Sequence, residues 1–447
     1  MKARSLALRA VILGSGILGA GLVCAYLTTV IFGGNGGDPT ATLPEPADQQ
    51  LVSRGHYVAT LGDCAACHTA PGSPDYAGRL PIETPIGTVY TTNITPDEQH
   101  GIGRYSLGDF ERAVRRGIRR DGASLYPAMP FPAYSRISDA DVRALYAYFT
   151  RGVQPVHQAN HGASIAWPLS MRWPLTFWRW AFAPAPAGTP GQDQLARGAY
   201  LVEGLGHCGT CHTPRGAGLE ERALGAMDGP LYLSGGVVDH YVASNLRGDV
   251  RTGLGSWSEA DIVEFLQTGR TRKAGVFGGM SDVVTHSTQS MTRADLEAIA
   301  HYLKSLPPAG SEAPFEYEAA AAGKLSAGQD LTPAALNYLN NCAACHLSSG
   351  RGYEHVFPAL AGNPVINAAD PTSLINIVLT GATVPSTDSA PSHFSMPGLG
   401  ARLSDEEVAD VVTFVRSSWG NTAAAVSPAT VGKLRVALDA PRPARGQ

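Results

Sequence analysis

One five-residue pattern occurs three times in this 447-residue chain: a cysteine, two variable residues, a second cysteine and a histidine. The copies are Cys64-Ala-Ala-Cys67-His68, Cys208-Gly-Thr-Cys211-His212 and Cys342-Ala-Ala-Cys345-His346. Because residues three and four apart share one face of a helical turn, the two thiols of each copy can form thioethers to the two vinyl groups of one haem. The histidine that follows can then reach the haem iron. The pattern therefore predicts three covalently bound haem c groups, with their irons held by His68, His212 and His346.

Two other readings of the pattern are a zinc half-site and a thioredoxin-like redox pair. A zinc site would want a second Cys/His pair for each motif, and redox pairs belong in a βαβ context. Neither reading accounts for a histidine directly after the second cysteine in all three copies. The seventh cysteine, Cys24, lies alone in an apolar run, so no set of cysteines remains for a disulfide framework.

The sequence around the motifs repeats as well, which indicates three related domains. Arg54-Gly55 and Arg197-Gly198 precede the first two motifs, each at the opening of a short helix. A middle helix then ends at a glycine in every copy, a position that favours the left-handed conformation. These glycines are Gly117, Gly269 and Gly381. Capping residues mark the helix starts, namely Ser106 with Asp109, Ser258 with Asp261 and Asp370 with Pro371 for the middle helices, and Ser138 with Asp141, Thr292 with Asp295 and Ser404 with Glu407 for the last helices.

Each copy also places one methionine between its middle and last helices: Met129, Met280 and Met396. A thioether is a soft ligand for haem iron, and His/Met ligation raises the reduction potential. The alternative is a methionine that fills a gap in the core. In the second copy Met227 lies early and Met291 directly precedes the last helix, so Met280 fits the ligand position best. We therefore predict these three methionines as the second axial ligands.

The spacing of apolar residues sets the expected fold class. Apolar residues recur at helical spacing along the last helices, and no strand-like alternation of comparable strength is present. The expected fold is therefore all-α, with three tandem cytochrome-c-like helical domains preceded by one transmembrane or signal helix. The expected boundaries are 10–32 for the transmembrane anchor or signal segment, 33–50 for a tether, 51–152 for cytochrome domain one, 153–191 for an aromatic-rich linker, 192–308 for domain two, 309–332 for a linker, 333–422 for domain three and 423–447 for a tail.

The N-terminus combines three basic residues, Lys2, Arg4 and Arg9, with an uncharged run from Ala10 to Phe32. At about 1.5 Å per residue this run is long enough to cross a ~30 Å hydrocarbon core. It is long for the apolar part of a cleaved signal, which favours an uncleaved anchor over a signal peptide. Either way, the basic flank places the chain from Asp38 onward outside the cytoplasm, on the periplasmic side of the inner membrane. The formal charge of −4 and the lack of a basic run argue against nucleic-acid binding.

Several longer segments carry a resemblance to a known family: Gly62–His68, Thr92–Pro96, Leu125–Pro130, Leu169–Leu175 and Cys208–Gly216. They resemble the triple-haem cytochrome c subunits of membrane-bound periplasmic dehydrogenases, which act on alcohols, gluconate, sorbitol, fructose, aldehydes or glucose. The resemblance covers nearly everything after residue 50 and implies a non-catalytic electron-transfer subunit. Its partner would be a catalytic subunit of flavin, PQQ or molybdenum type, and its acceptor would be ubiquinone or a terminal oxidase. The chain departs from the family after residue 422, where it lacks a clear amphipathic helix.

Two alternative functions are a multihaem enzyme, such as a peroxidase or reductase, and the cytochrome subunit of a terminal oxidase or nitric oxide reductase. Catalysis at a haem needs an exchangeable sixth ligand position, whereas each predicted site here has a methionine to fill it. No flavin, quinone or molybdenum fingerprint is visible elsewhere in the sequence. An oxidase subunit would share the haem chemistry but not the tryptophan-rich linker.

That linker holds four of the six tryptophans, Trp167, Trp173, Trp178 and Trp180. Large amphipathic rings are favoured at subunit interfaces and membrane surfaces, so the linker is a candidate docking surface for the catalytic subunit or for lipid headgroups. The alternative is that it packs one domain against the next. The arginines between Arg112 and Arg120 are a second candidate, able to attract an acidic partner, or else a solvated helix face.

Overall fold

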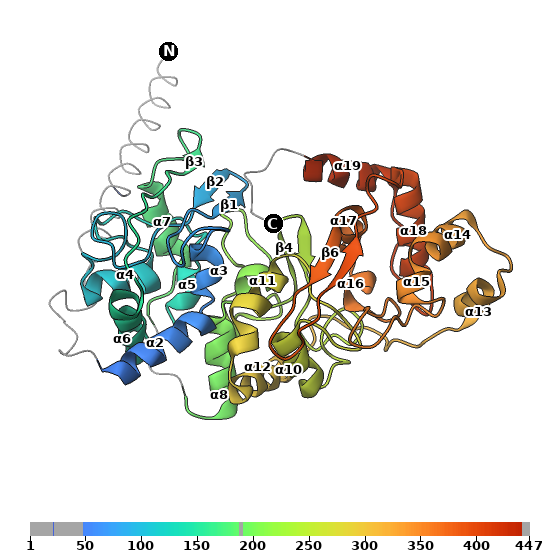
Figure 1. Cartoon of the computed structure of the whole chain (residues 1–447), viewed down its shortest axis with the longest axis horizontal. Helices are drawn as coiled ribbons and strands as arrows, with labels where there is room; N and C mark the ends of the chain where they lie inside the picture. The colour runs from blue at the N-terminus through green and yellow to red at the C-terminus, as the bar shows by residue number, and fades with distance from the viewer. Residues whose placement is uncertain (1–20, 22–47, 187–190, 440–447) are drawn as a thin grey trace, which may run out of the picture. The chain divides into compact units, whose positions relative to one another are not determined.

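The computed structural model describes Gly21, residues 48–186 and residues 191–439 (Figure 1). The predicted anchor or signal segment 10–32 and the tether lie almost entirely outside the described residues, as does the end of the tail. The chain divides into two compact units, which are described separately. The first comprises Met1–Gly55 and Ile82–Gly188, and the second comprises His56–Pro81 and Thr189–Gln447. Within the described ranges, no helix is long and apolar enough to cross a membrane.

The first unit combines short helices with one small sheet. Its elements are α2 (Gln49–Leu61, whose last turns belong to the second unit), β1 (Pro81–Thr84), β2 (Gly87–Tyr90), α4 (Leu107–Arg116), α5 (Phe131–Tyr134), α6 (Asp139–Ala147), β3 (Ser164–Ile165) and α7 (Pro174–Phe182). Strand β2 pairs antiparallel with β3, with Gly87 opposite Ile165. The buried side chains of Phe110, Phe131 and Leu145 belong to the core of this unit.

The second unit contains the first haem motif and the whole second repeat. Its elements up to residue 305 are α3 (Cys64–His68), α8 (Gln194–Ala199), α9 (Gly209–His212), β4 (Gly236–Val238), β5 (Tyr241–Ala243), α10 (Glu259–Thr268), α11 (Gly279–His286) and α12 (Arg293–Ser305). Helix α12 contacts both α8 and α10, and α11 contacts α3. Strands β4 and β5 form an antiparallel hairpin, with Val237 opposite Val242.

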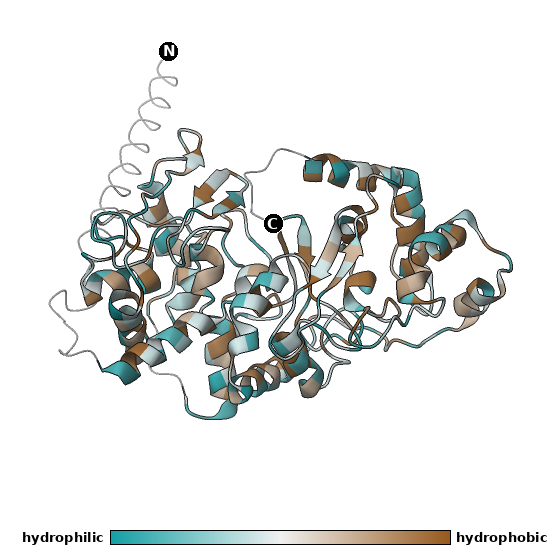
Figure 2. Ribbon diagram, viewed as in Figure 1, coloured by the Kyte–Doolittle hydropathy of each residue, from teal (hydrophilic) through white to brown (hydrophobic). Residues whose placement is uncertain are grey.

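The third repeat completes the second unit. Its elements are α13 (Ala320–Ala327), α14 (Pro333–Asn341), α15 (Ala343–His346), α16 (Pro364–Asn367), α17 (Thr372–Thr380), β6 (Gly381–Val384), β7 (Phe394–Pro397), α18 (Asp405–Ser417) and α19 (Pro428–Asp439). Hydrophobic and hydrophilic residues occur together along these helices (Figure 2), and the apolar side chains of α18 are buried against α14 and α17. Tyr338, Val408 and Trp419 lie in this core with almost no exposure.

The predicted helix starts are confirmed at the capping boxes. Ser106, Ser258 and Ser404 each cap a helix, and the carboxylate three residues later returns the hydrogen bond. Gly117 and Gly269 end their helices with φ of 63° and 71° in the left-handed region. Gly381 differs, because its φ of 84° and ψ of −178° lead the chain directly from α17 into β6.

The prediction of an all-α fold is wrong. The described residues also contain one three-stranded sheet, β1-β2-β3, and two hairpins, β4-β5 and β6-β7. Each of these strands has only two to four residues. A strand that short offers at most two alternations of apolar and polar residues, so it leaves no period-two signal in the sequence. The correction matters for function, because β7 carries Met396.

Candidate haem sites

The three cysteine motifs fold into the same local structure. Each histidine ends one short helix, α3, α9 or α15, and its backbone carbonyl then accepts a hydrogen bond from a glycine N–H. The donors are Gly78 to His68 and Gly235 to His212, both at 2.7 Å, and Gly352 to His346 at 3.1 Å. None of the six motif cysteines forms a disulfide. The repeated helical turn therefore presents two thiols outside any disulfide and one imidazole in each motif.

Backbone carbonyls hold the motif histidines of the second and third repeats. His212 Nδ1 lies 2.7 Å from the Ser244 carbonyl oxygen, and His346 Nδ1 lies 3.0 Å from that of Pro358. A carbonyl only accepts hydrogen bonds, so Nδ1 carries the proton in both residues. Burial lowers the pKa of both imidazoles, which keeps them neutral. The Nε2 atom of each ring is thereby left with a lone pair, the arrangement found in histidines that bind a metal.

The cysteine thiols are not prepared for thiolate chemistry. Burial raises the pKa of Cys64 and Cys208 to about 12 and the pKa of Cys211 and Cys342 to about 11. A redox-active Cys-x-x-Cys pair depends on a lowered thiol pKa. The thioredoxin-like reading of the motif therefore has no support from the environment of these thiols.

In the third repeat the structure brings the motif and the predicted methionine to one core. Met396 lies on β7, opposite Ala382 of β6, and packs against the same hydrophobic cluster as Cys342. Phe394, two residues earlier on β7, contacts the ring of Phe357 at 5.9 Å. Phe357 directly precedes Pro358, the acceptor of the His346 hydrogen bond. These contacts connect the strand of Met396 with the loop that orients His346.

In the second repeat the methionine is carried by α11. Met280 lies two residues after Gly278, which has a φ of 56°. The backbone at Gly278 packs against the Tyr241 ring, and a Cβ there would lie 3.0 Å from that ring. Tyr241 lies on β5, three residues before Ser244. Met227 is 99% exposed, whereas Met291 is buried in the core at 8%. Met280 stays the predicted ligand on its position in the sequence.

In the first repeat His68 and Met129 belong to different compact units, so their pairing stays a prediction. Side chains of the aromatic linker contact the loop that carries Met129. Arg172 donates to the Ser124 carbonyl at 3.0 Å and stacks over the Tyr126 ring at 4.4 Å. Trp178 makes an edge contact with Phe131 at 5.9 Å.

The predicted docking surfaces now divide into packed and exposed residues. Trp178 packs against Phe131 and Phe182, whereas Trp167, Trp173 and Trp180 are 79%, 54% and 74% exposed. The arginine cluster on and just after α4 is locally balanced, because each of its arginines has a carboxylate within 4 Å. These residues are Arg112, Arg115, Arg116, Arg119 and Arg120.

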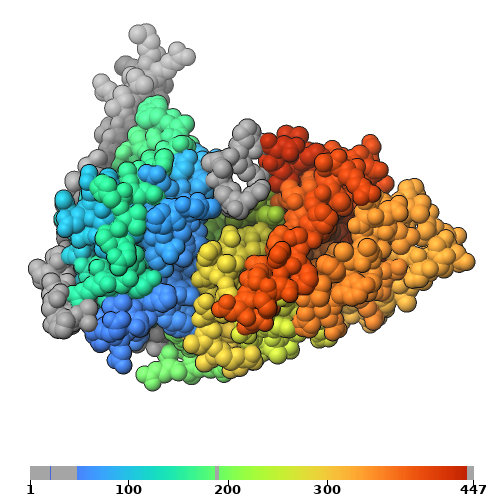
Figure 3. All heavy atoms as spheres, in the orientation of Figure 1, coloured from blue at the N-terminus to red at the C-terminus, as the bar shows by residue number. Residues whose placement is uncertain are grey.

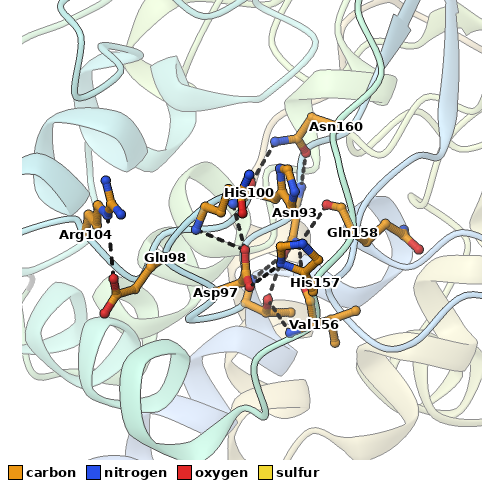
Figure 4. A network of polar contacts seen from close by, with 11 residues as sticks. Asn93, Asp97, Glu98, His100, Arg104, Val156, His157, Gln158 and Asn160 are labelled. Atoms are coloured by element: carbon orange, nitrogen blue, oxygen red, sulfur yellow. Dashed lines mark hydrogen bonds and ion pairs between the residues drawn. The ribbon is translucent and has the colours of Figure 1, made fainter.

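A turn that sequence analysis missed recurs in the first two repeats. In the first, the Asn93 side chain accepts from Thr95 N–H at 2.9 Å, and Asp97 leads a small network that includes His157 (Figure 4). In the second, Asn245 accepts from Arg247 N–H at 2.8 Å. Because Asn245 follows Ser244, this turn holds the carbonyl that orients His212. The sequence did contain a signal for this turn. Both copies have the pattern Asn-x-x-x-Asp, and a Gly-x-Gly begins eight residues after the asparagine.

Buried polar atoms beside α9 test whether a haem suits the second site. The Tyr232 hydroxyl is buried without a hydrogen-bond partner, as is Nε of Arg247, and Arg247 donates from Nη1 to the Tyr232 carbonyl at 3.0 Å. Tyr232 lies against Gly209 of the motif turn. Buried donors of this kind need an acceptor, and the propionates of a haem supply carboxylate oxygens. The residues present therefore fit the group.

Comparison with known proteins agrees with this fit. A sequence model of the cytochrome c family matches residues 195–307 and 327–419. The cytochrome c subunit of alcohol dehydrogenase (quinone) from Gluconacetobacter polyoxogenes is 52% identical over 407 residues, covering 89% of this chain and 87% of the relative. The gluconate 2-dehydrogenase cytochrome c subunit of Pantoea cypripedii is 50% identical over 88% and 92% of the two chains. The fructose dehydrogenase cytochrome subunit of Gluconobacter japonicus is 37% identical over 89% and 85%.

The fold and the motifs define a c-type cytochrome, which binds haem c covalently. More particularly, the chain belongs to the family of cytochrome c subunits of dehydrogenase complexes. It is an electron-transfer subunit rather than the catalytic one, and its partner is a dehydrogenase catalytic subunit.

Proposed function

We propose that this subunit carries three haem c groups and passes electrons through them from the catalytic subunit to ubiquinone or a terminal oxidase. The observation that carries the proposal is the shared motif structure, in which His212 and His346 are each oriented by a carbonyl 2.7 and 3.0 Å from Nδ1. The same helical turn surrounds His68. One motif of this kind serves one haem, so three motifs support three haems.

Each haem has its own set of residues in this proposal. Every cysteine pair forms two thioethers, and a histidine and a methionine complete the iron coordination. The axial pairs are His68 with Met129, His212 with Met280 and His346 with Met396. When bound, the haem iron supplies one-electron redox chemistry, and the thioether ligand raises its potential. A methionine ligand would leave no position at the iron for a substrate, which fits an electron carrier rather than an enzyme.

Helix α11 supports a relay between the sites of the second unit. It carries Met280, and it packs against α3 of the first motif. Ser281 Oγ also donates to the Thr383 carbonyl at 3.4 Å, and Thr383 pairs with Ser395 beside Met396. Figure 3 shows the corresponding orange segment lying along the yellow one. Helix α11 therefore adjoins the first motif helix, carries the predicted methionine of the second site and contacts β6, the strand paired with that of Met396.

The relatives support the proposed partner and acceptor. Their names link them to an alcohol dehydrogenase (quinone), a gluconate 2-dehydrogenase and a fructose dehydrogenase. We therefore expect a catalytic subunit with flavin, PQQ or molybdenum that oxidises a small alcohol, sugar or aldehyde. The basic and then uncharged N-terminal sequence supports export, with the haem domains on the periplasmic side of the inner membrane.

The haem count tests the proposal directly. Intact mass of the purified subunit should exceed the polypeptide mass by three haems, and changing both Cys208 and Cys211 to Ala should remove one of them. The resting visible spectrum should show only low-spin iron. A mass increase of two haems would refute the three-site proposal, and high-spin iron in the native protein would favour a peroxidase-like enzyme instead.

A further inference from the structure

A cavity of about 350 Å³ lies between the second and third repeats, inside the second unit. Glu264 and Thr268 of α10 and the neighbouring Arg270 line one side. From the third repeat, His355 lines it together with Ala390, which precedes β7, and Phe394, the first residue of β7. Neither the haem motifs nor their predicted methionines line this cavity, so the function described above does not yet use it.

Arg270 is the unusual group in this cavity. Arg270 is only 8% exposed, and its Nη2 donates to the Ala390 carbonyl at 2.9 Å. The guanidinium also stacks on the Phe394 ring, with Cζ 4.9 Å from the ring centroid. The remaining amino group, Nη1, is buried and has no hydrogen-bond partner. A buried guanidinium is costly unless an acceptor, best an anion, meets its free donors.

The nearby carboxylate of Glu264 does not fill this role. Its Oε1 lies 3.0 Å from Nδ1 of His355, and the contacts of Arg270 are to Ala390 and Phe394 instead. The free donor of Arg270 therefore matches an anion from outside the polypeptide, and the planar fork of arginine is suited to a carboxylate.

The position of Phe394 indicates which carboxylate this is. Phe394 and Met396 stand two residues apart on β7, so their side chains lie on the same face of the hairpin. The Phe394 ring also contacts Phe357, the residue before the Pro358 carbonyl that orients His346. Arg270 thus stacks on a ring of the strand that carries Met396, and this ring contacts the residue before the carbonyl that orients His346.

We propose that Arg270, a residue of the second repeat, binds a propionate carboxylate of the third haem. The inference rests on the proposed haem at Cys342 and Cys345. A fixed positive charge beside the propionate favours the reduced haem, so Arg270 raises the potential of the third haem relative to the second. It acts as a positioning residue, because it touches the periphery of the cofactor and not the iron.

The test is a redox titration of the purified holoprotein, followed through the haem absorbance. Arg270→Gln should make the third haem harder to reduce by about tenfold in its equilibrium constant, which corresponds to about 59 mV for one electron. Met396→Leu identifies the titration step that belongs to the third haem, and Met280→Leu identifies that of the second. Arg272→Gln is the matched control. It removes the same charge two residues along the chain, but from a side chain that is exposed.

The outcomes separate this inference from the proposed function. If the wild-type protein carries only two haems and the cysteines of the third motif are unmodified, the proposed function fails first. If three haems are present, the inference is overturned when Arg270→Gln moves no step, moves the step assigned by Met280→Leu, or moves a step no further than Arg272→Gln does. Arg270→Lys keeps the charge but loses the fork, so it should give a smaller shift of the same step. Should Arg270→Gln fail to fold, an unchanged titration of Arg270→Lys overturns the inference.

Discussion

Arg197 donates two hydrogen bonds to Asp295, from Nε to Oδ1 at 2.8 Å and from Nη2 to Oδ2 at 2.9 Å. Asp295 is also the third residue of α12, where its N–H is capped by Thr292. Arg54 and Asp141 repeat the pair in the first unit, with Nη2 2.8 Å from Oδ1. In the first two repeats, the carboxylate near the start of the last helix therefore also fixes the helix that leads into the haem motif.

This pairing predicts a pH-dependent loss of stability. Burial alone would raise the pKa of Asp295, but hydrogen bonds from Arg197 and Tyr57 outweigh it and lower the pKa. A carboxyl with a lowered folded-state pKa stabilises the protein above its unfolded value, about 3.9, and that contribution is lost as the pH falls through the folded value. Arg197→Gln should therefore cost about 1 kcal/mol at pH 7, and the difference from wild type should shrink as the pH falls from about 4 through the lowered folded-state pKa.

The measurement is denaturant unfolding of both proteins across this pH range. Arg293→Gln is the control on the same helix, because Arg293 forms an exposed pair with Glu297 and should change stability very little. A deficit of Arg197→Gln that stays constant down to pH 3 would mean that the charge of Asp295 does not contribute.

Gly198 should not tolerate a side chain. A Cβ at this position would lie 2.1 Å from the Ala298 carbonyl oxygen and 2.6 Å from the Tyr302 Cβ, so α8 could no longer approach α12. Gly198→Ala should destabilise the protein by about 3 kcal/mol, the upper range for overpacking. Gly323→Ala is the matched control, since its Cβ would meet nothing within 4 Å on α13 and should stabilise by about 0.5 kcal/mol. Equal melting temperatures for the two variants would contradict the close packing.

The features that could be predicted from the sequence are those with local signals. Ser106 with Asp109 and Ser258 with Asp261 are capping boxes within four residues, so they are readable without knowing any tertiary contact. Met280 could be preferred because its competitors stand at the wrong distance from the last helix. Whether Met280 binds the iron stays a prediction.

Other features depend on contacts between residues far apart in sequence. Ala382 opposes Met396 in a hairpin of two four-residue strands, and only the fold brings them together. Arg270 contacts Ala390 and Phe394, which lie more than one hundred residues later in the chain. Tyr232 likewise stands out only once its hydroxyl is found buried without a partner. No short-range pattern marks such residues, which is why sequence analysis missed them.

The aromatic linker should separate into a structural and a surface group. Trp178 packs against Phe131 and Phe182, so Trp178→Ala should destabilise the isolated subunit by about 2 kcal/mol. Trp180 is 74% exposed, so Trp180→Ala should change stability by less than about 0.5 kcal/mol. If the exposed rings form a docking surface, Trp180→Ala should still weaken binding to the catalytic subunit or to lipid vesicles. Unchanged binding to both would leave that surface without a docking role.

The three methionines of the second repeat give the sharpest test of axial ligation. Leucine has nearly the volume of methionine but no sulfur, so substitution removes the ligand and largely preserves packing. Met280→Leu should therefore convert one of the haems from low-spin to high-spin iron and lower its potential. Met227→Leu should change neither spectrum nor stability, because Met227 is 99% exposed. Met291→Leu should cost less than about 1.5 kcal/mol and leave the spectrum unchanged, because Met291 is buried in the core. Visible spectra and redox titrations of the three holoproteins distinguish these cases. A high-spin haem in Met291→Leu, with Met280→Leu remaining low-spin, would transfer the ligand role to Met291.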